Sequence, residues 1–223
     1  MTQELWTAVD SYICNLLLPP DAALTAALQA AEAAGLPPIA VSPAQGKLLH
    51  LLARVQGARN ILEIGTLGGY STIWLARALP ANGRLISLEM DAKHAEVART
   101  NIAFAGLGGM VEVRLGKALD TLPQIAAESR GPFDLIFIDA DKTNIPAYFD
   151  WALKLSRPGA LVIVDNIVRD GKVIDAAGTD PNIQGVRRFN EQLAAEPRVS
   201  ATEIQTVGAK GYDGFALVLV DPS

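Results

Sequence analysis

The segment Ile61–Ser71, with the sequence ILEIGTLGGYS, constrains the fold of this chain more than any other. An apolar run ends in the carboxylate of Glu63, a turn with three glycines follows, and a helical pattern begins at Tyr70. Glycine can adopt positive φ and lets a ligand approach the backbone closely. A strand, a glycine turn and a helix start form the unit that holds an adenosine-type ligand at the carboxyl edge of a parallel sheet. The segment therefore predicts such a site, with a simple connection between strand and helix as the alternative.

From Arg59 onwards the hydrophobic pattern alternates between strands and helices, which is typical of a doubly wound α/β sheet that is mostly parallel. The apolar runs LIFIDA and LVIVDN end in carboxylates, as central strands do at a ligand-binding edge. Two closing strands flank GAKGYDG, a loop that suits a hairpin. The predicted strands are 60–64, 84–89, 111–115, 133–139, 160–165, 199–207 and 215–220, and the helices between them are 70–79, 92–105, 118–129, 145–155 and 183–195.

The first 57 residues precede the first strand and show helical spacing. Prolines and capping residues divide them into three predicted helices, at 4–18, 22–34 and 43–57. We expect one domain over residues 1–223, in which 58–223 form the cofactor-binding core. Residues 1–57 are interpreted as a helical extension that packs on this core and contributes to dimerisation; a cap on the substrate side is the alternative.

Composition limits the cellular compartments and the binding partners that fit the chain. The formal net charge of −5 argues against a broad phosphate-binding surface, although a local basic patch is not excluded. The single cysteine, Cys14, lies in an apolar helical pattern, so a reducing compartment fits. No apolar run approaches the ~20 residues that span a bilayer, and the amino terminus lacks the pattern of a secretory signal. We therefore expect a cytoplasmic protein without a membrane partner.

The glycine turn and the acids around it indicate which cofactor would bind. The turn Gly65–Gly69 lacks the G-x-G-x-x-G spacing of a dinucleotide fold. A carboxylate at Glu63 repels a pyrophosphate and attracts a cation, which favours the sulfonium and ammonium groups of S-adenosylmethionine over NAD. Ser71 at the helix start can donate to the carboxylate of this ligand. Glu89, at the end of the next strand, can accept both ribose hydroxyls, and the small residues at 116–118 suit an adenine contact.

Oxygen ligands for a hard metal ion follow two neighbouring predicted strands. Asp139 ends one strand, and Asp165 and Asn166 end the next. Their oxygens suit Mg²⁺, Mn²⁺ or Ca²⁺ rather than zinc, and the two histidines, His50 and His94, lie in helical patterns. Such an ion can bind two vicinal oxygens of a substrate and lower the pKa of one hydroxyl.

Lys142 lies beside these acids in the sequence IDADK. A nearby cation would depress the pKa of this lysine, which could then act as a general base. A surface ion pair with Asp141 is the alternative interpretation. The catalytic role is favoured, because Lys142 lies beside two strands that end in carboxylates.

The motifs LEIGTLGGYS, SLEMD, FIDADK and VDN, in this order and spacing, resemble those of the cation-dependent O-methyltransferases of the caffeoyl-CoA and catechol group, especially its small bacterial members. The resemblance extends from about Val41 to the carboxyl terminus. It implies a Rossmann-like seven-stranded sheet with a reversed last strand, S-adenosylmethionine and Mg²⁺ as cofactors, and methylation of one hydroxyl of a vicinal diol on an aromatic ring. The dimers of plant-type members suggest a homodimer. By position, the resemblance implies that the cofactor contacts are Val41, Glu63, Gly65, Thr66, Ser71, Glu89, Ala118 and Asp139, that the metal ligands are Asp139, Asp165 and Asn166, and that the catalytic residues are Lys142, as the base, and Asp139.

The sequence leaves the methyl acceptor open. A catechol-like phenol is the leading hypothesis, and a hydroxylated uridine in transfer RNA is the second, which the acidic net charge disfavours. A cofactor-binding protein without turnover and a nicotinamide dehydrogenase are weaker alternatives. The segments 168–182 and 208–214 are expected to border the acceptor. Their side chains at Arg169, Lys172, Lys210 and Tyr212 could contact an acidic or aromatic substrate, or could be solvated.

Overall fold

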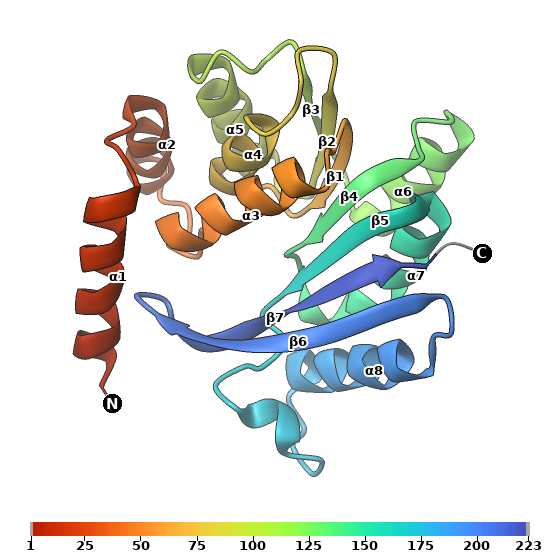
Figure 1. Cartoon of the computed structure of the whole chain (residues 1–223). Helices are drawn as coiled ribbons and strands as arrows, with labels where there is room; N and C mark the ends of the chain where they lie inside the picture. The colour runs from red at the N-terminus through yellow and green to blue at the C-terminus, as the bar shows by residue number, and fades with distance from the viewer. Residues whose placement is uncertain (1, 222–223) are drawn as a thin grey trace.

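The computed structural model describes residues 2–221, and within them a seven-stranded sheet forms the centre, with helices on both faces (Figure 1). The strands are β1 (Asn60–Ile64), β2 (Arg84–Glu89), β3 (Val111–Leu115), β4 (Phe133–Ile138), β5 (Ser156–Asp165), β6 (Val199–Gly208) and β7 (Gly211–Val220). The α-helices are α1 (Gln3–Leu17), α2 (Ala22–Ala33), α3 (Pro43–Val55), α4 (Tyr70–Ala76), α5 (Ala92–Phe104), α6 (Ala118–Ala127), α7 (Ile145–Leu155) and α8 (Pro181–Ala195), and two short 3-10 helices are η1 (Lys142–Asn144) and η2 (Lys172–Ile174).

The strand order is β3-β2-β1-β4-β5-β7-β6. Strands β1 to β5 pair in parallel, whereas β7 is antiparallel to both β5 and β6. This confirms the predicted mostly parallel sheet with a reversed last strand. The strand order changes direction beside β1, which pairs with β2 on one side and β4 on the other. Ligands of open α/β sheets bind at the carboxyl ends of the strands at such a point.

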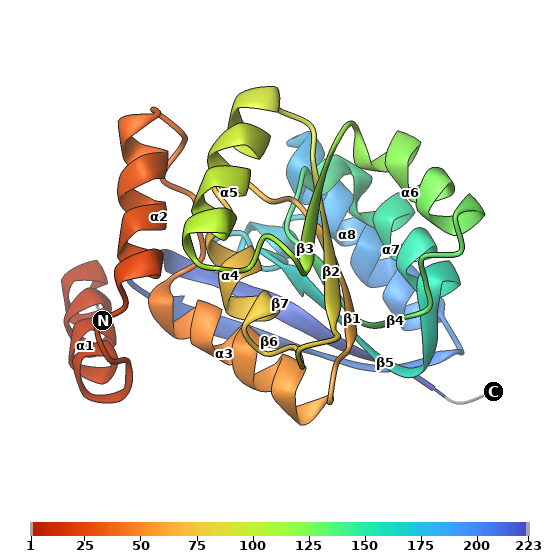
Figure 2. The same ribbon diagram turned by 90° about the horizontal axis from the view of Figure 1, so that it is seen from above.

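Successive side chains of each strand point to opposite faces of the sheet, so the core has two layers. In β1, Leu62 and Ile64 pack with α6, α7 and α8, whereas Ile61 packs with α3, α4 and α5. Figure 2 shows these two groups of helices on opposite sides of the sheet. All three of these β1 side chains are completely buried, and each buried aliphatic side chain contributes about 1.5–3 kcal/mol to folding.

Most of the predicted elements lie within one or two residues of the observed ones. Three boundaries differ by more. Helix α4 ends at Ala76 instead of residue 79, β5 begins at Ser156 instead of 160, and β7 begins at Gly211 instead of 215. The last difference arises because the hairpin turn is tight: Gly208 already pairs with Gly211, so most of the predicted loop is strand.

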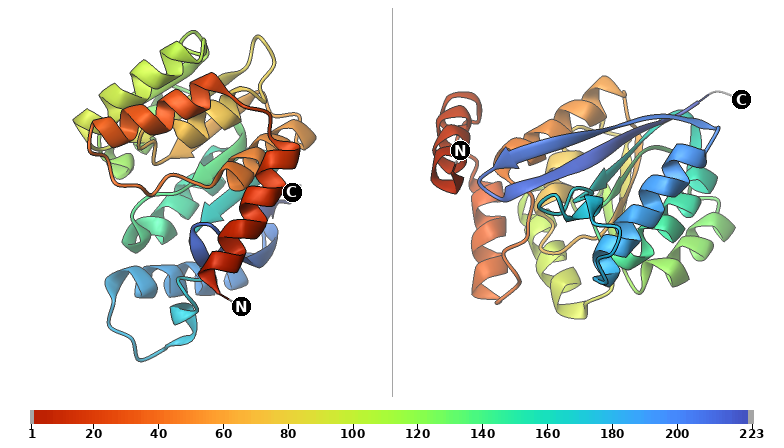
Figure 3. Two further views of the ribbon diagram at one scale, coloured as in Figure 1. Left: turned by 90° about the vertical axis from the view of Figure 1, so that its left-hand side faces the viewer. Right: turned by 90° about the horizontal axis from the view of Figure 1, so that it is seen from below.

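The amino-terminal extension is helical, as predicted, but its first helix differs from the other two. Helices α2 and α3 contribute buried side chains to the core, whereas α1 has none. Helix α1 lies beside the tip of the β6–β7 hairpin (Figure 3), where the Gln3 side chain donates to the Gly208 carbonyl at 2.9 Å and the Ala209 N–H donates to Asp10 at 2.7 Å. Across the described chain, none of the helices combines the length and the apolar character needed to cross a membrane.

Candidate functional site

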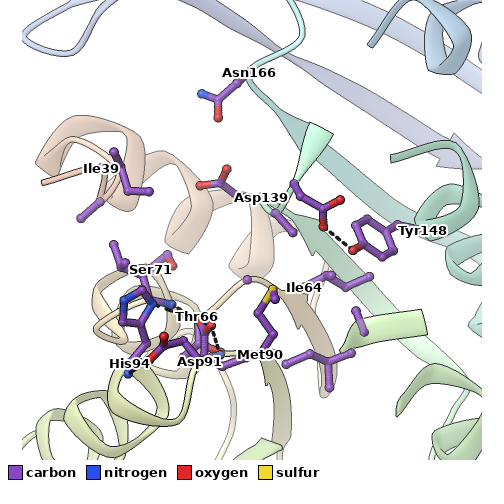
Figure 4. Close-up of a pocket in the computed structure, with 18 of the residues that line it drawn as sticks. Ile39, Ile64, Thr66, Ser71, Met90, Asp91, His94, Asp139, Tyr148 and Asn166 are labelled. Carbon is purple, nitrogen blue, oxygen red and sulfur yellow. Dashed lines mark hydrogen bonds and ion pairs between the residues drawn. The ribbon is translucent and has the colours of Figure 1, made fainter. Parts of the chain in front are cut away.

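A cavity of about 640 Å³ opens at the carboxyl ends of β1, β2 and β4. This is the edge of the sheet at which the sequence places its glycine turn and its acids. Figure 4 shows Thr66, Ser71, Asp91 and His94 toward one end of the cavity and Asp139, Tyr148 and Asn166 toward the other. Its walls contain nine of the residues predicted to contact cofactor or metal or to act in catalysis: Val41, Gly65, Thr66, Ser71, Glu89, Ala118, Asp139, Lys142 and Asn166.

The glycine turn after β1 is required by the packing beneath the cavity. Gly65 has φ of 102°, and a Cβ atom at this position would lie only 2.0 Å from the carbonyl oxygen of Asp139. Its N–H donates to the Leu88 carbonyl at 3.0 Å, which ties β1 to the end of β2. Gly69, with φ of 82°, is the N-cap residue of α4. The turn therefore brings the ends of three strands together around one cavity.

Glu63 lies below the cavity wall rather than in it. Its side chain is completely buried and accepts hydrogen bonds from the hydroxyls of Ser71 at 2.7 Å, Thr72 at 2.5 Å and Ser87 at 2.6 Å. Burial raises the pKa of Glu63 from 4.5 to about 7, although these three hydroxyls act in the opposite direction. The carboxylate fixes the hydroxyl of Ser71, and Ser71 lines the cavity. Glu63 therefore reaches the cavity through Ser71 and does not line it itself.

Glu89 lines the cavity as a fixed acceptor. One of its carboxylate oxygens accepts the N–H of Leu67 at 2.8 Å, and the other accepts the N–H of Asp91 at 3.0 Å. The His94 ring lies 3.8 Å from the same carboxylate. Each oxygen keeps a lone pair, so the carboxylate can accept two further hydroxyls, as the sequence-based interpretation requires for a ribose.

The ends of β4 and β5 bring Asp139, Asp165 and Lys142 together. The Lys142 ammonium donates to Asp139 at 2.9 Å. Burial and the charge of Asp139 raise the pKa of Asp165, whose side chain is 5% exposed. Asn166 follows with φ of 60°, a left-handed conformation that is uncommon for a residue other than glycine and that often marks a functional position.

Lys142 pairs with Asp139 rather than with Asp141, the partner considered in the alternative interpretation. Asp141 accepts instead from the Tyr148 hydroxyl at 2.5 Å and from the Asn144 amide at 2.6 Å. Burial raises the pKa of Tyr148 above its ordinary value, and the adjacent carboxylate adds to this effect. Both Asp141 and Tyr148 line the cavity, and the sequence motif IDADK was the available signal for Asp141.

A second cavity of about 260 Å³ lies on the other side of Asn166. It is bordered by α1, the beginning of α3 and the β6–β7 hairpin, and its lining includes Asp10, Gln45, Asp165 and Lys210. Asn166 lines both cavities. The two cavities therefore meet at the end of β5, beside the predicted metal ligands.

The two loop segments differ in what they bring to these cavities. Arg169 lines the larger cavity, and Lys210 lines the smaller one while its ammonium donates to the Pro38 carbonyl at 3.0 Å. The Lys172 side chain is 67% exposed and pairs with Asp170, so it is a solvated surface residue. Tyr212 donates to Gln205 and packs against the core.

Within residues 2–221, no group of three or more His, Cys, Asp and Glu side chains is arranged to hold a metal ion. The set of ligands predicted from the sequence, Asp139, Asp165 and Asn166, contains only two residues of these types, and its third member is an amide. His50 contacts the Trp74 carbonyl at 3.1 Å. It packs against the Trp74 ring, as expected for a structural helix residue.

Comparison with known proteins identifies the family. The family model described as O-methyltransferase matches residues 18–219. A catechol O-methyltransferase of Niastella koreensis is 57% identical over 220 residues, which is 99% of this chain and 100% of that protein. The structure of an O-methyltransferase from Bacillus cereus in complex with SAH superposes with a TM-score of 0.98 at 61% identity, covering 99% of this chain and 100% of the other. The O-methyltransferase TomG from Streptomyces achromogenes, solved in complex with SAM, gives a TM-score of 0.96 at 56% identity and covers 100% of both chains.

The chain belongs to the O-methyltransferase family and is an S-adenosylmethionine-dependent enzyme. This confirms the resemblance to the caffeoyl-CoA and catechol group, the fold and the enzyme class. It also removes the two weaker alternatives, a nicotinamide dehydrogenase and a protein without turnover.

Proposed function

We propose that this enzyme methylates one hydroxyl of a catechol-like vicinal diol and that a divalent ion, Mg²⁺ in the first instance, takes part. The observation that carries the proposal is the meeting of two carboxylates, an amide and a lysine at the junction of the two cavities. The relatives named catechol O-methyltransferase support the acceptor class.

The donor set fits a hard divalent ion. Asp165 is buried close enough to Asp139 for the negative charge of Asp139 to raise its pKa, and two like charges held together in this way favour a bound cation. Asp139, Asp165 and Asn166 offer only oxygen as the ligand atom, which suits Mg²⁺, Mn²⁺ or Ca²⁺. When bound, the ion would orient the two oxygens of the diol and lower the pKa of one hydroxyl.

The larger cavity would hold the cofactor, and the residues around it would orient the methyl group. Glu89 would accept the ribose hydroxyls, because its carboxylate is held by two backbone donors. Glu63 would act through Ser71, whose hydroxyl it fixes. Ala118 would allow the adenine edge to approach the backbone. Val41, Gly65, Thr66 and Asp139 would complete the set of cofactor contacts.

Lys142 would remove the proton from the reacting hydroxyl. Its ammonium is 2.9 Å from Asp139, and both residues line the larger cavity. A lysine must lose its own proton before it can act as a base, and a neighbouring cation favours that loss. Fixing acceptor oxygen, methyl carbon and sulfur in line can supply about 7–11 kcal/mol of barrier reduction.

The proposal is tested with purified enzyme, labelled S-adenosylmethionine and three acceptors: catechol, caffeate and resorcinol, which is the matched control because its hydroxyls are not vicinal. We expect label transfer to catechol and caffeate, loss of transfer with EDTA, and recovery when Mg²⁺ is restored. Transfer that is unaffected by EDTA would contradict the metal mechanism. Equal transfer to resorcinol would contradict chelation of a vicinal diol.

We also propose that the enzyme is a homodimer formed through α1. This helix has no buried residue, and several of its large apolar side chains are exposed: Leu5, Val9, Tyr12, Ile13, Leu16 and Leu17. An apolar helix face of this extent favours association with a second copy. Light scattering should give twice the chain mass, and Leu16→Glu with Leu17→Glu should give the monomer. A monomeric wild type at micromolar concentration would refute the proposal.

The free thiol of Cys14 fits the cytoplasm as the location.

A further inference from the structure

Gln45 connects the amino-terminal extension to the predicted metal ligands. It lies in the first turn of α3, and its side-chain amide donates to one carboxylate oxygen of Asp165 at 2.7 Å. The two residues are 120 positions apart in the sequence. Gln45 also lines the smaller cavity, next to Asp165 and Asn166. No motif in the sequence points to this residue.

The start of α3 is held firmly, so the position of Gln45 is well defined. The Ser42 hydroxyl accepts the Gln45 N–H at 3.2 Å and caps the helix, and Pro43 occupies its first position. One residue further, Gly46 packs against the Trp74 ring so closely that a Cβ atom there would lie 2.3 Å from it. Helix α3 is thus seated against α4 at the turn that carries Gln45.

The hydrogen bond from Gln45 completes the support of the Asp165 carboxylate. The other carboxylate oxygen accepts the N–H of Asn166 at 2.9 Å. With one donor on each oxygen, the carboxylate plane is fixed, and each oxygen keeps a lone pair for another partner. Because Asp165 is almost completely buried, loss of the Gln45 amide would remove one of the two donors that fix its carboxylate.

We infer that Gln45 is a positioning residue that holds Asp165 in the orientation required to bind the divalent ion. The inference rests on the proposed metal dependence. Residues that orient metal ligands through a hydrogen bond typically change metal affinity by about 10–100-fold when they are substituted. The amino-terminal extension therefore does more than cover the core, because it supplies one hydrogen bond to the metal centre.

The test compares Gln45→Met, which keeps the shape of the side chain and removes the donor, with Gln45→Asn, which keeps the amide and shortens its reach. Gln56→Met is the matched control: Gln56 lies at the other end of α3 and donates to the Gly159 carbonyl, far from the metal ligands. Mg²⁺ affinity is measured by calorimetry with SAH bound, the affinity for SAH is measured with EDTA, and the transfer rate is measured against Mg²⁺ concentration.

We expect both Gln45 variants to bind Mg²⁺ about 10-fold more weakly than the wild type and to recover their transfer rate at high Mg²⁺. The affinity for SAH should stay within about twofold, and Gln56→Met should bind Mg²⁺ as the wild type does. If Gln45→Met does not fold, Gln45→Asn decides. Unchanged Mg²⁺ affinity in a folded Gln45 variant overturns the inference, as does a lower rate that Mg²⁺ cannot restore. A wild type that binds no Mg²⁺ instead refutes the metal dependence itself.

Discussion

Gly185 allows α8 to approach the segment that carries Lys142, and its replacement by alanine gives the sharpest prediction. A Cβ atom at Gly185 would lie 2.1 Å from the carbonyl oxygen of Lys142, 2.7 Å from its carbonyl carbon and 2.8 Å from Thr143 Cα. All three are backbone atoms, so rotation of a side chain cannot relieve the overlap. Ordinary contacts between such atoms are about 3.5 Å, so α8 and η1 must separate by about 1 Å.

The expected effect of Gly185→Ala has two parts. Overpacking of a tight contact costs about 1–3 kcal/mol, which for a chain of this size lowers Tm by roughly 2–12 °C. A displacement of about 1 Å at a reacting group can lower kcat by about 100-fold. Because Lys142 is the proposed base and the ribose contacts lie at β2, the affinity for SAH should change by less than about threefold.

The assay measures kcat, KM for the acceptor, the dissociation constant of SAH and Tm for the wild type and two variants. Gly109→Ala is the control, because a Cβ atom there meets nothing within 4 Å. The reasoning is refuted if Gly185→Ala keeps kcat within about twofold of the wild type, or if its loss of kcat is matched by an equal loss of SAH affinity.

Three other substitutions test separate parts of the site. Asp165→Ala should lower the Mg²⁺-stimulated rate at least about 100-fold while SAH binding in EDTA stays within twofold; parallel losses would contradict its assignment as a metal ligand. Lys142→Met should lower kcat by about 10²–10⁴-fold while the affinity for SAH stays within about threefold, whereas a kcat within about twofold of the wild type would exclude it as the base. The third substitution concerns Glu63, whose pKa is raised from 4.5 to about 7 in the folded state. Between these pH values the folded protein binds more protons than the unfolded chain. The free energy of unfolding therefore falls by up to about 3 kcal/mol as pH rises from 4.5 to about 7. In urea unfolding with EDTA at pH 5 and pH 8, Glu63→Gln should lack this loss; an equal loss in the variant would show that Glu63 is not its source.

The fold and the strand ends of the site could be predicted because their signals are local in sequence. Asp139 and Asp165 each end an apolar run, and parallel strands place such ends on one edge. The direction of Glu63 also had a local signal that the sequence-based interpretation did not use. It is two residues from Ile61, so both point toward the layer of α3 to α5, where Ser71 and Thr72 at the start of α4 offer hydroxyls.

Contacts between distant segments could not be predicted in this way. The hydrogen bond from Gln45 to Asp165 depends on how α3 is seated against α4, and the approach of Gly185 to Lys142 depends on how α8 packs on η1. Neither residue belongs to a motif, and a glycine or glutamine in a helix has no pattern that reveals its tertiary neighbour. Prediction from one sequence therefore found residues that line the two cavities and missed residues that position them.

Asn166 lines both cavities, and this has a consequence for inhibitor design. A compound with one part in each cavity would therefore contact the Asn166 side chain from both parts. Substitution of Asn166 should then weaken such a compound more than a compound that fills the larger cavity alone.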